Sequence, residues 1–153
     1  MSEKVQLEVL PANTGADEVT AEQVTALNAN GFDGVIGLRY TELSADRVRG
    51  EWTVGPSLHQ AYGVVHGGVY SAVVESLAST AAWTWLNRAG TGGGVVGVNN
   101  NTDFLRSVTR GTLHAEATPI HRGRLQQIWQ VVITDDRSRL VARGQVRLQN
   151  LGS

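Results

Sequence analysis

The stretch that decides the fold is 67–88, which reads GGVYSAVVESLASTAAWTWLNR. It contains no proline, is dense in alanine, leucine and tryptophan, and is followed by the glycine-rich turn AGTGGG at 89–94. Its length corresponds to about six helical turns. Apolar residues occur nearly all round such a helix rather than in one stripe. The stretch therefore predicts one long helix that is buried, not a helix lying on the surface.

Segments with alternating polar and apolar residues lie on both sides of this helix, and that pattern is typical of half-buried strands. A short helix is predicted at 20–30, where Thr20 and Gln23 have the spacing of a capping box. We predict strands at 34–43, 46–54, 95–104, 112–120, 126–134 and 140–149. This order favours an α+β fold, in which an antiparallel sheet covers one central helix. Residues 1–31 would form an N-terminal segment before a domain at 32–153.

The composition indicates one globular domain and excludes several classes of function. The chain has 153 residues, 41% of them hydrophobic, which suits a single domain with a core. A net charge of −1 argues against nucleic-acid binding. Cysteine is absent, which excludes disulfides, thiolate ligands and cysteine nucleophiles. The four histidines show no metal-ligand spacing, so we expect no metal site.

Two features of the sequence indicate where in the cell the protein lies. Residues 1–10 carry alternating charges without an apolar run, which argues against a secretory signal. No stretch approaches the 18 or so apolar residues of a membrane span. We therefore expect a cytoplasmic protein without a membrane partner.

Two positions of the long helix could carry chemistry. Glu75 lies two turns into a helix that otherwise reads as buried, and glutamates are seldom buried without a partner. It is either functional, or held by a structural hydrogen bond or a subunit contact. At the helix start, free N–H groups can bind an oxygen that carries negative charge. The Gly67 N–H could thus polarise a carbonyl, as an oxyanion hole does, unless the glycines only permit tight packing.

The spacing of these two positions has a consequence for assembly. Gly67 and Glu75 are eight residues apart, or about 12 Å along an ideal helix, which is too far to serve one small reacting group. Two antiparallel chains could bring Gly67 of one next to Glu75 of the other, so a functional site would lie at a dimer interface. Ser79, one turn beyond Glu75 on the same face, could bind a water or form a helix contact. Gln60 could bind a substrate or cap a loop.

Four arginines cluster around the later predicted strands: Arg106, Arg110, Arg122 and Arg124. Arginine forks suit phosphate groups, although solvated loop charges are the simpler interpretation of each one singly.

Together these residues resemble the hot-dog-fold acyl-CoA thioesterases. The segment QAYGVVHGGVYSAVVESLAS at 60–79 contains the family pattern: a glutamine, His-Gly-Gly, an acid on the helix, and serine or threonine one turn later. The acid is Glu75 rather than aspartate. A glutamate at this position resembles the subgroup that contains the Arthrobacter-type 4-hydroxybenzoyl-CoA thioesterase and the 1,4-dihydroxy-2-naphthoyl-CoA thioesterase. ATPIHRGR at 117–124 and QIWQ at 127–130 are similar to the latter enzymes, whereas DFLR at 103–106 departs from the family pattern.

The resemblance implies a hot-dog fold, in which an antiparallel sheet of five to six strands wraps around one long central helix. It also implies how subunits assemble. Two subunits would pair their sheets into one continuous sheet, with the active sites across this dimer interface. Two such dimers would form a homotetramer.

The resemblance also implies a reaction and roles for particular residues. The substrate would be an aromatic acyl-CoA, hydrolysed to the free acid and CoA without a metal or redox cofactor. Glu75 would be the nucleophile or the general base, and Gly67 would polarise the thioester carbonyl. Gln60 and His66 would orient the reacting groups, and Ser79 would position the water. The CoA phosphates would be held by Arg106, Arg122 and Arg124.

Three other functions stay open. A thioesterase acting on short or medium fatty acyl-CoA would use the same residues. Hydratases and dehydratases of this fold use a His and Asp pair in a longer motif, which is not found here. A non-catalytic acyl-CoA-binding protein could keep the arginines and the pocket without needing Glu75.

Overall fold

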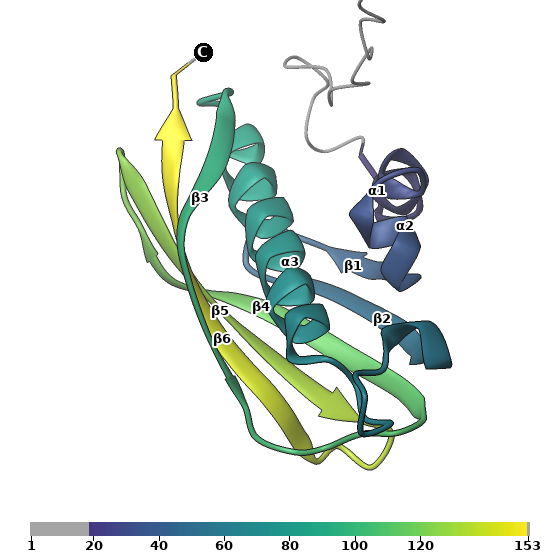
Figure 1. Cartoon of the computed structure of the whole chain (residues 1–153). Coiled ribbons are helices and arrows are strands. Elements are labelled where there is room, and N and C mark those ends of the chain that lie inside the picture. Colours follow the sequence, from purple (N-terminus) through teal and green to yellow (C-terminus); the bar gives the residue numbers. More distant parts are fainter. Residues whose placement is uncertain (1–18, 153) are drawn as a thin grey trace, which may run out of the picture.

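The computed structural model describes residues 19–152, which form one antiparallel sheet curved around a central helix (Figure 1). The six strands are β1 (Arg39–Leu43), β2 (Val48–Val54), β3 (Gly94–Phe104), β4 (Gly111–Arg122), β5 (Gln126–Asp135) and β6 (Leu140–Leu151). Their order in the sheet is β1-β2-β4-β5-β6-β3. The helices are α1 (Ala21–Asn28), α2 (Phe32–Ile36), α3 (Gly67–Arg88) and the 3-10 turn η1 (Pro56–Leu58). The predicted α+β architecture, with its sheet around one long helix, is confirmed.

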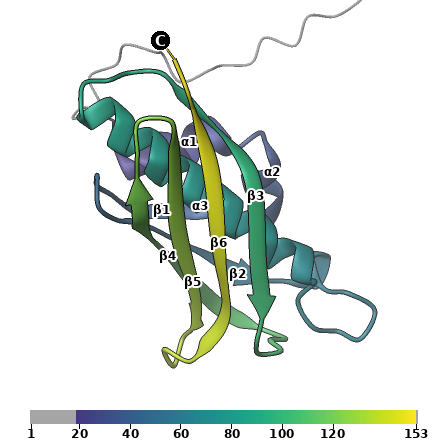
Figure 2. The same ribbon diagram turned by 90° about the vertical axis from the view of Figure 1, so that its left-hand side faces the viewer.

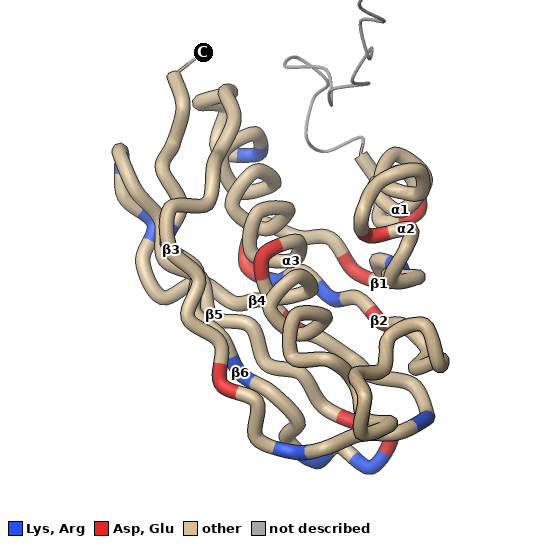
Figure 3. The backbone as a smooth tube through the Cα atoms, in the orientation of Figure 1, with Lys and Arg blue, Asp and Glu red and all other residues tan. Residues whose placement is uncertain are grey.

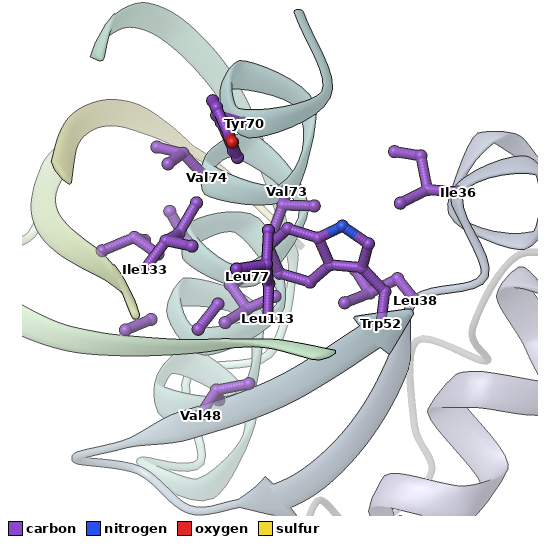
Figure 4. Close-up of a cluster of buried hydrophobic side chains, with 14 of the residues drawn as sticks. Ile36, Leu38, Val48, Trp52, Tyr70, Val73, Val74, Leu77, Leu113 and Ile133 are labelled. Carbon is purple, nitrogen blue, oxygen red and sulfur yellow. The ribbon is translucent and has the colours of Figure 1, made fainter. Parts of the chain in front are cut away.

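The central helix α3 has the predicted limits and supplies much of the core. Ten of its 22 residues are buried, and its only charged residues are Glu75 and Arg88. Leu77 on α3 and Trp52 and Leu113 on the sheet are among the largest fully buried side chains (Figure 4). The hydrophobic core is therefore formed by the concave face of the sheet packing against α3.

The N-terminal helix α1 is capped as predicted. The Thr20 hydroxyl accepts a hydrogen bond from the Gln23 N–H, and Gln23 Oε1 accepts one from the Thr20 N–H. The rest of the predicted segment 1–31, up to residue 18, lies outside the described residues.

The predicted strand at 34–43 is wrong in its first half, which belongs to α2. Gly37 adopts a left-handed conformation with φ 78° and ends the helix, and the Leu38 N–H bonds back to the Asp33 carbonyl. The Asp33 carboxylate is buried and accepts hydrogen bonds from the Ser76 and Tyr40 hydroxyls. This buried anchor to α3 gives α2 a partner that local sequence patterns cannot reveal.

The strand β3 forms one edge of the sheet and pairs with β6 (Figure 2). Most of its residues are exposed, including Val96 and Val98. An unpaired edge with apolar side chains is a surface to which another strand can add.

None of the helices in residues 19–152 combines the length and the hydrophobicity that a membrane-spanning helix needs.

Candidate functional site

A row of small and polar residues runs along the side of α3 that faces β3. Its members, Gly67, Ser71, Glu75 and Ser79, recur every four residues and are all half-buried. Residues at this spacing share one slowly winding face of a helix. We call this set the polar row. It interrupts the apolar surface that the sequence predicted nearly all round the helix.

The Glu75 carboxylate is held between α3 and β3. Its Oε2 accepts a hydrogen bond from Asn100 Nδ2 at 3.1 Å. Its Oε1 lies so close to the backbone of Gly97 that a Cβ there would be 1.8 Å away. No lysine or arginine within residues 19–152 forms an ion pair with Glu75. The carboxylate is thus fixed by a neutral donor and a close backbone contact, beside the free edge of the sheet.

Asn100 is a residue that the sequence reasoning missed. Its Nδ2 also donates to the Ser71 carbonyl at 2.9 Å, and its Oδ1 accepts from the Thr102 hydroxyl at 2.7 Å. A signal was present, because asparagine is depleted in strands and yet NNN occupies 99–101 of a predicted strand.

The start of α3 presents a free donor. His66 Nδ1 accepts a hydrogen bond from the Gly68 N–H at 2.8 Å, which leaves the ring proton on Nε2. The Gly67 N–H has no acceptor within the described part of the chain. Next to it, a Cβ at Gly67 would lie 2.3 Å from Phe104 Cε2, so the Phe104 ring covers this glycine. The arrangement can present one backbone N–H to a carbonyl oxygen, and the polarising role of Gly67 stays a prediction.

A pocket of about 250 Å³ adjoins this helix start. Its lining includes three of the predicted site residues, Gln60, Gly67 and Arg106. Tyr70 and Phe104 form its aromatic part, with ring centroids 5.8 Å apart. Burial raises the pKa of the Tyr70 phenol to about 12, so it stays neutral at physiological pH. The structure therefore places a free N–H, aromatic surface and a cation around one opening.

The Gln60 side chain forms a hydrogen bond within its own loop. Its Oε1 accepts a hydrogen bond from the Tyr62 N–H at 2.5 Å, and its backbone N–H donates to the Val64 carbonyl. This is the loop-capping role that the sequence left open. The side chain also lines the pocket, so both interpretations of Gln60 remain compatible with its position.

The three arginines predicted to bind phosphate occupy different environments. Arg106 borders the pocket, and its Nε donates to the Leu140 carbonyl. Arg122 pairs with Asp46 at 2.7 Å and lies over the Trp85 ring near the C-terminal end of α3, which ties the β1–β2 turn to β4. Arg124 is exposed in the β4–β5 turn. Within one chain, only Arg106 lies beside the Gly67 pocket.

Charged side chains also gather in the β5–β6 turn and just before β4. Arg110, Arg137 and Arg139 line a pocket of about 430 Å³ there, together with Asp135 and Asp136. Figure 3 shows blue segments close together at this lower end of the molecule. Residues 19–152 hold no group of three or more side chains that could bind a metal ion.

Within one chain, the polar row places its two reactive groups at different points. Gly67 lies against Phe104, at one end of β3, and Glu75 lies against Gly97 and Asn100, nearer the other end. Eight residues of helix separate them, about 12 Å. The carboxylate and the free N–H therefore cannot meet on one small group inside a single chain, as the spacing in the sequence predicted.

Comparisons with known proteins agree on one family. The model of the thioesterase superfamily matches residues 62–142. The Mycobacterium tuberculosis protein Rv1847, which is provisionally named an esterase, is 61% identical over 120 residues, covering 78% of this chain and 86% of the relative. The proofreading thioesterase EntH of Klebsiella pneumoniae is 34% identical over 122 residues, covering 80% of this chain and 87% of EntH.

A solved structure supports the same assignment. The thioesterase HI1161 from Haemophilus influenzae superposes with a TM-score of 0.81 at 30% identity, covering 88% of this chain and 92% of HI1161. The residues that the family model matches, 62–142, include the helix start, the polar row and the edge strand described above. The predicted hot-dog fold is thereby confirmed, whereas the predicted subgroup of aromatic acyl-CoA thioesterases stays a prediction.

Proposed function

This chain belongs to the thioesterase superfamily, and from that premise we propose that it hydrolyses acyl-CoA thioesters to a free acid and CoA. The observation that supports this most is the pair of reactive groups on α3. Glu75 is held by Asn100 beside an open sheet edge, and the Gly67 N–H is free beside a pocket. Such a pair supplies what thioester hydrolysis needs, a carboxylate and a donor for the developing oxyanion.

The proposed site is shared between two copies of the chain. Gly67 and Glu75 both lie along β3, the exposed edge of the sheet. If a second copy pairs with this edge in antiparallel orientation, Gly67 of one copy approaches Glu75 of the other. A homodimer is therefore the smallest active unit in this proposal, and two dimers would form a homotetramer.

In the reaction, the thioester carbonyl oxygen accepts a hydrogen bond from the Gly67 N–H. By one route, Glu75 takes a proton from a water, whose oxygen bonds to the carbonyl carbon. The carbon–sulfur bond then breaks, and the thiolate takes up the proton. By the other route, the carboxylate of Glu75 bonds to the carbon and displaces the CoA thiolate. Water then hydrolyses the resulting anhydride.

Neighbouring residues would orient these groups. The Nε2–H of His66 and the side chain of Gln60 border the start of α3 and would direct the thioester. Ser79, one turn beyond Glu75, would hold the attacking water. Arg106 would contact the CoA phosphates from the pocket rim, with Arg122 and Arg124 of the second copy reaching the nucleotide. No metal or redox cofactor takes part in these steps, and we place them in the cytoplasm.

We favour an aromatic acyl group, with 1,4-dihydroxy-2-naphthoyl first and hydroxybenzoyl next. The support is the aromatic pair Tyr70 and Phe104 in the lining of the pocket, because aromatic rings pack well against one another. A short or medium fatty acyl group is the alternative.

The experiment is thiol release across a panel of acyl-CoA esters: dihydroxynaphthoyl, hydroxybenzoyl, phenylacetyl, hexanoyl and decanoyl. The protein has no cysteine, so it adds no thiol background to a colour reagent. We expect the highest kcat/KM with an aromatic ester. Highest turnover of a straight-chain ester would establish the fatty acyl alternative. Binding of several esters without any thiol release would contradict the proposed hydrolysis and favour a binding protein.

A further inference from the structure

The strand β3 contributes more to the site than an edge for pairing. Its inward-facing residues Gly97, Asn100 and Thr102 lie behind the Glu75 carboxylate, and their contacts form a chain that ends on it. We propose that Asn100, supported by Thr102, is a positioning residue that fixes Glu75 Oε2 and leaves Oε1 as the oxygen that reacts. This inference rests on the proposed hydrolysis and adds to it an assignment of atoms.

The orientation of the Asn100 amide is determined by its partners. Its Nδ2 contacts two acceptors, the Ser71 carbonyl at 2.9 Å and Glu75 Oε2 at 3.1 Å. Its Oδ1 accepts from the Thr102 hydroxyl at 2.7 Å. Turning the amide over would place Oδ1 against two other oxygens and lose both hydrogen bonds. Asn100 therefore always offers a donor, not an acceptor, to the carboxylate.

The two carboxylate oxygens of Glu75 therefore differ in their hydrogen bonding. Oε2 is committed to Asn100, whereas Oε1 lies over Gly97 and receives no hydrogen bond from any residue in 19–152. The absence of a side chain at Gly97 is what leaves room for Oε1, because a Cβ there would be 1.8 Å away. An oxygen without a donor keeps its lone pairs for a proton or a carbonyl carbon.

Thr102 acts through Asn100 rather than on the carboxylate. Its hydroxyl bonds to Asn100 Oδ1 and packs on β6, where a Cβ at Gly144 would lie 2.6 Å from it. The chain of contacts thus runs from β6 through Thr102 and Asn100 to Glu75. A carboxylate tied to the sheet in this way is held in one geometry, which speeds the chemical step and not substrate binding.

The first test is Asn100→Ala, with Asn101→Ala as a matched control. Asn101 is the neighbouring asparagine on the same strand, paired with Gln145, and it points to the opposite face of the sheet. With the best substrate of the panel, we expect Asn100→Ala to lower kcat about ten- to a hundredfold with little change in KM, because a hydrogen bond to a charged group is lost. Asn101→Ala should keep the wild-type kcat. An unchanged kcat in Asn100→Ala would overturn the proposal, as would a loss confined to KM.

The second test asks whether Thr102 works through Asn100. We expect Thr102→Val to lower kcat severalfold and Thr102→Ser, which keeps the hydroxyl, to restore most of it. In the Asn100→Ala background, Thr102→Val should cause no further loss, since the shared contact is already gone. Independent, multiplicative losses in the double variant would contradict the chain of contacts.

The outcomes also separate this inference from the function on which it rests. If the wild-type protein releases no thiol from any ester, the proposed function itself fails. If the wild-type protein is active and Asn100→Ala is equally active, only the positioning role fails. Thermal unfolding and gel filtration of each variant show whether a loss of kcat reflects a loss of fold or of dimer.

Discussion

The two sides of α3 meet the sheet in different ways. On one side, Val73, Val74 and Leu77 have no exposed surface and pack against the concave face of the sheet. On the other, the polar row is half-buried against the edge strand β3, where a carboxylate and an amide replace apolar contacts. One helix thus stabilises the fold with one face and offers reactive groups with the other. Substitutions on the two faces should therefore affect different measurements.

The largest effect is expected from Glu75→Gln, which keeps the size of the side chain and removes its ability to act as base or nucleophile. Turnover should fall about 10²- to 10⁴-fold, while the midpoint of thermal unfolding stays near that of the wild type. Thiol release and a melting curve on the same preparation measure both. Turnover close to the wild-type value would show that the polar row does not carry the reaction.

At the helix start, Gly67→Pro removes the N–H donor directly. Proline is tolerated at the first position of a helix, and His66 already has the extended conformation, φ −65° and ψ 132°, that a following proline requires. We expect kcat to fall about 10²- to 10³-fold, as for loss of an oxyanion donor.

Gly67→Ala is the matched control for this change, since it adds the same Cβ against Phe104 and keeps the N–H. It should lose far less activity than Gly67→Pro. Equal losses in the two variants would mean that crowding at Phe104, and not the donor, explains the result.

Substitutions on the apolar face of α3 should lower stability, unlike those on the polar row, which should lower turnover. Leu77→Ala leaves a cavity in the core and should lower the free energy of unfolding by about 2–5 kcal/mol. Ser79 lies two residues after Leu77 but belongs to the polar row. Ser79→Ala should change the free energy of unfolding by less than about 0.5 kcal/mol. Urea unfolding measures both. A similar destabilisation by the two substitutions would remove the distinction between the faces.

Within the site, Gly97→Ala should lower turnover less than the changes at Glu75 and Gly67, because it only places a methyl group where Glu75 Oε1 now lies. The carboxylate sits at the end of a flexible side chain and can move aside, so stability should change little. Its displacement should lower kcat about tenfold, corresponding to roughly 1.4 kcal/mol. A loss of stability with full activity would place the role of Gly97 in folding rather than in the site.

Much of this molecule could be predicted because its signals are local. The limits of α3 follow from a long stretch without proline that ends in glycines, and alternation located most of the six strands. The separation of Gly67 and Glu75 followed from helix geometry alone. By contrast, α2 depends on the buried contacts of Asp33 with Tyr40 and Ser76, which are remote in the sequence.

The part of the site that could not be predicted is also non-local. Asn100 reaches Glu75 across 25 residues, and only the packing of β3 along α3 brings them together. Likewise, the sequence indicates that Arg122 could bind phosphate, but it cannot show that Asp46 and Trp85 already contact its guanidinium. Spacing along one element is readable from a sequence, whereas the partners of a side chain depend on the fold.

The central claim, an active site shared by two chains, is tested most directly by mixing two inactive variants. Gly67→Pro and Glu75→Gln chains carrying different tags would be co-expressed, and the mixed dimers would be purified through both tags. In a symmetric dimer, one of the two shared sites then combines an intact Gly67 with an intact Glu75. The account predicts thiol release at about half the wild-type rate per dimer. Activity no higher than that of either parent would contradict it and place Gly67 and Glu75 in the same site of one chain.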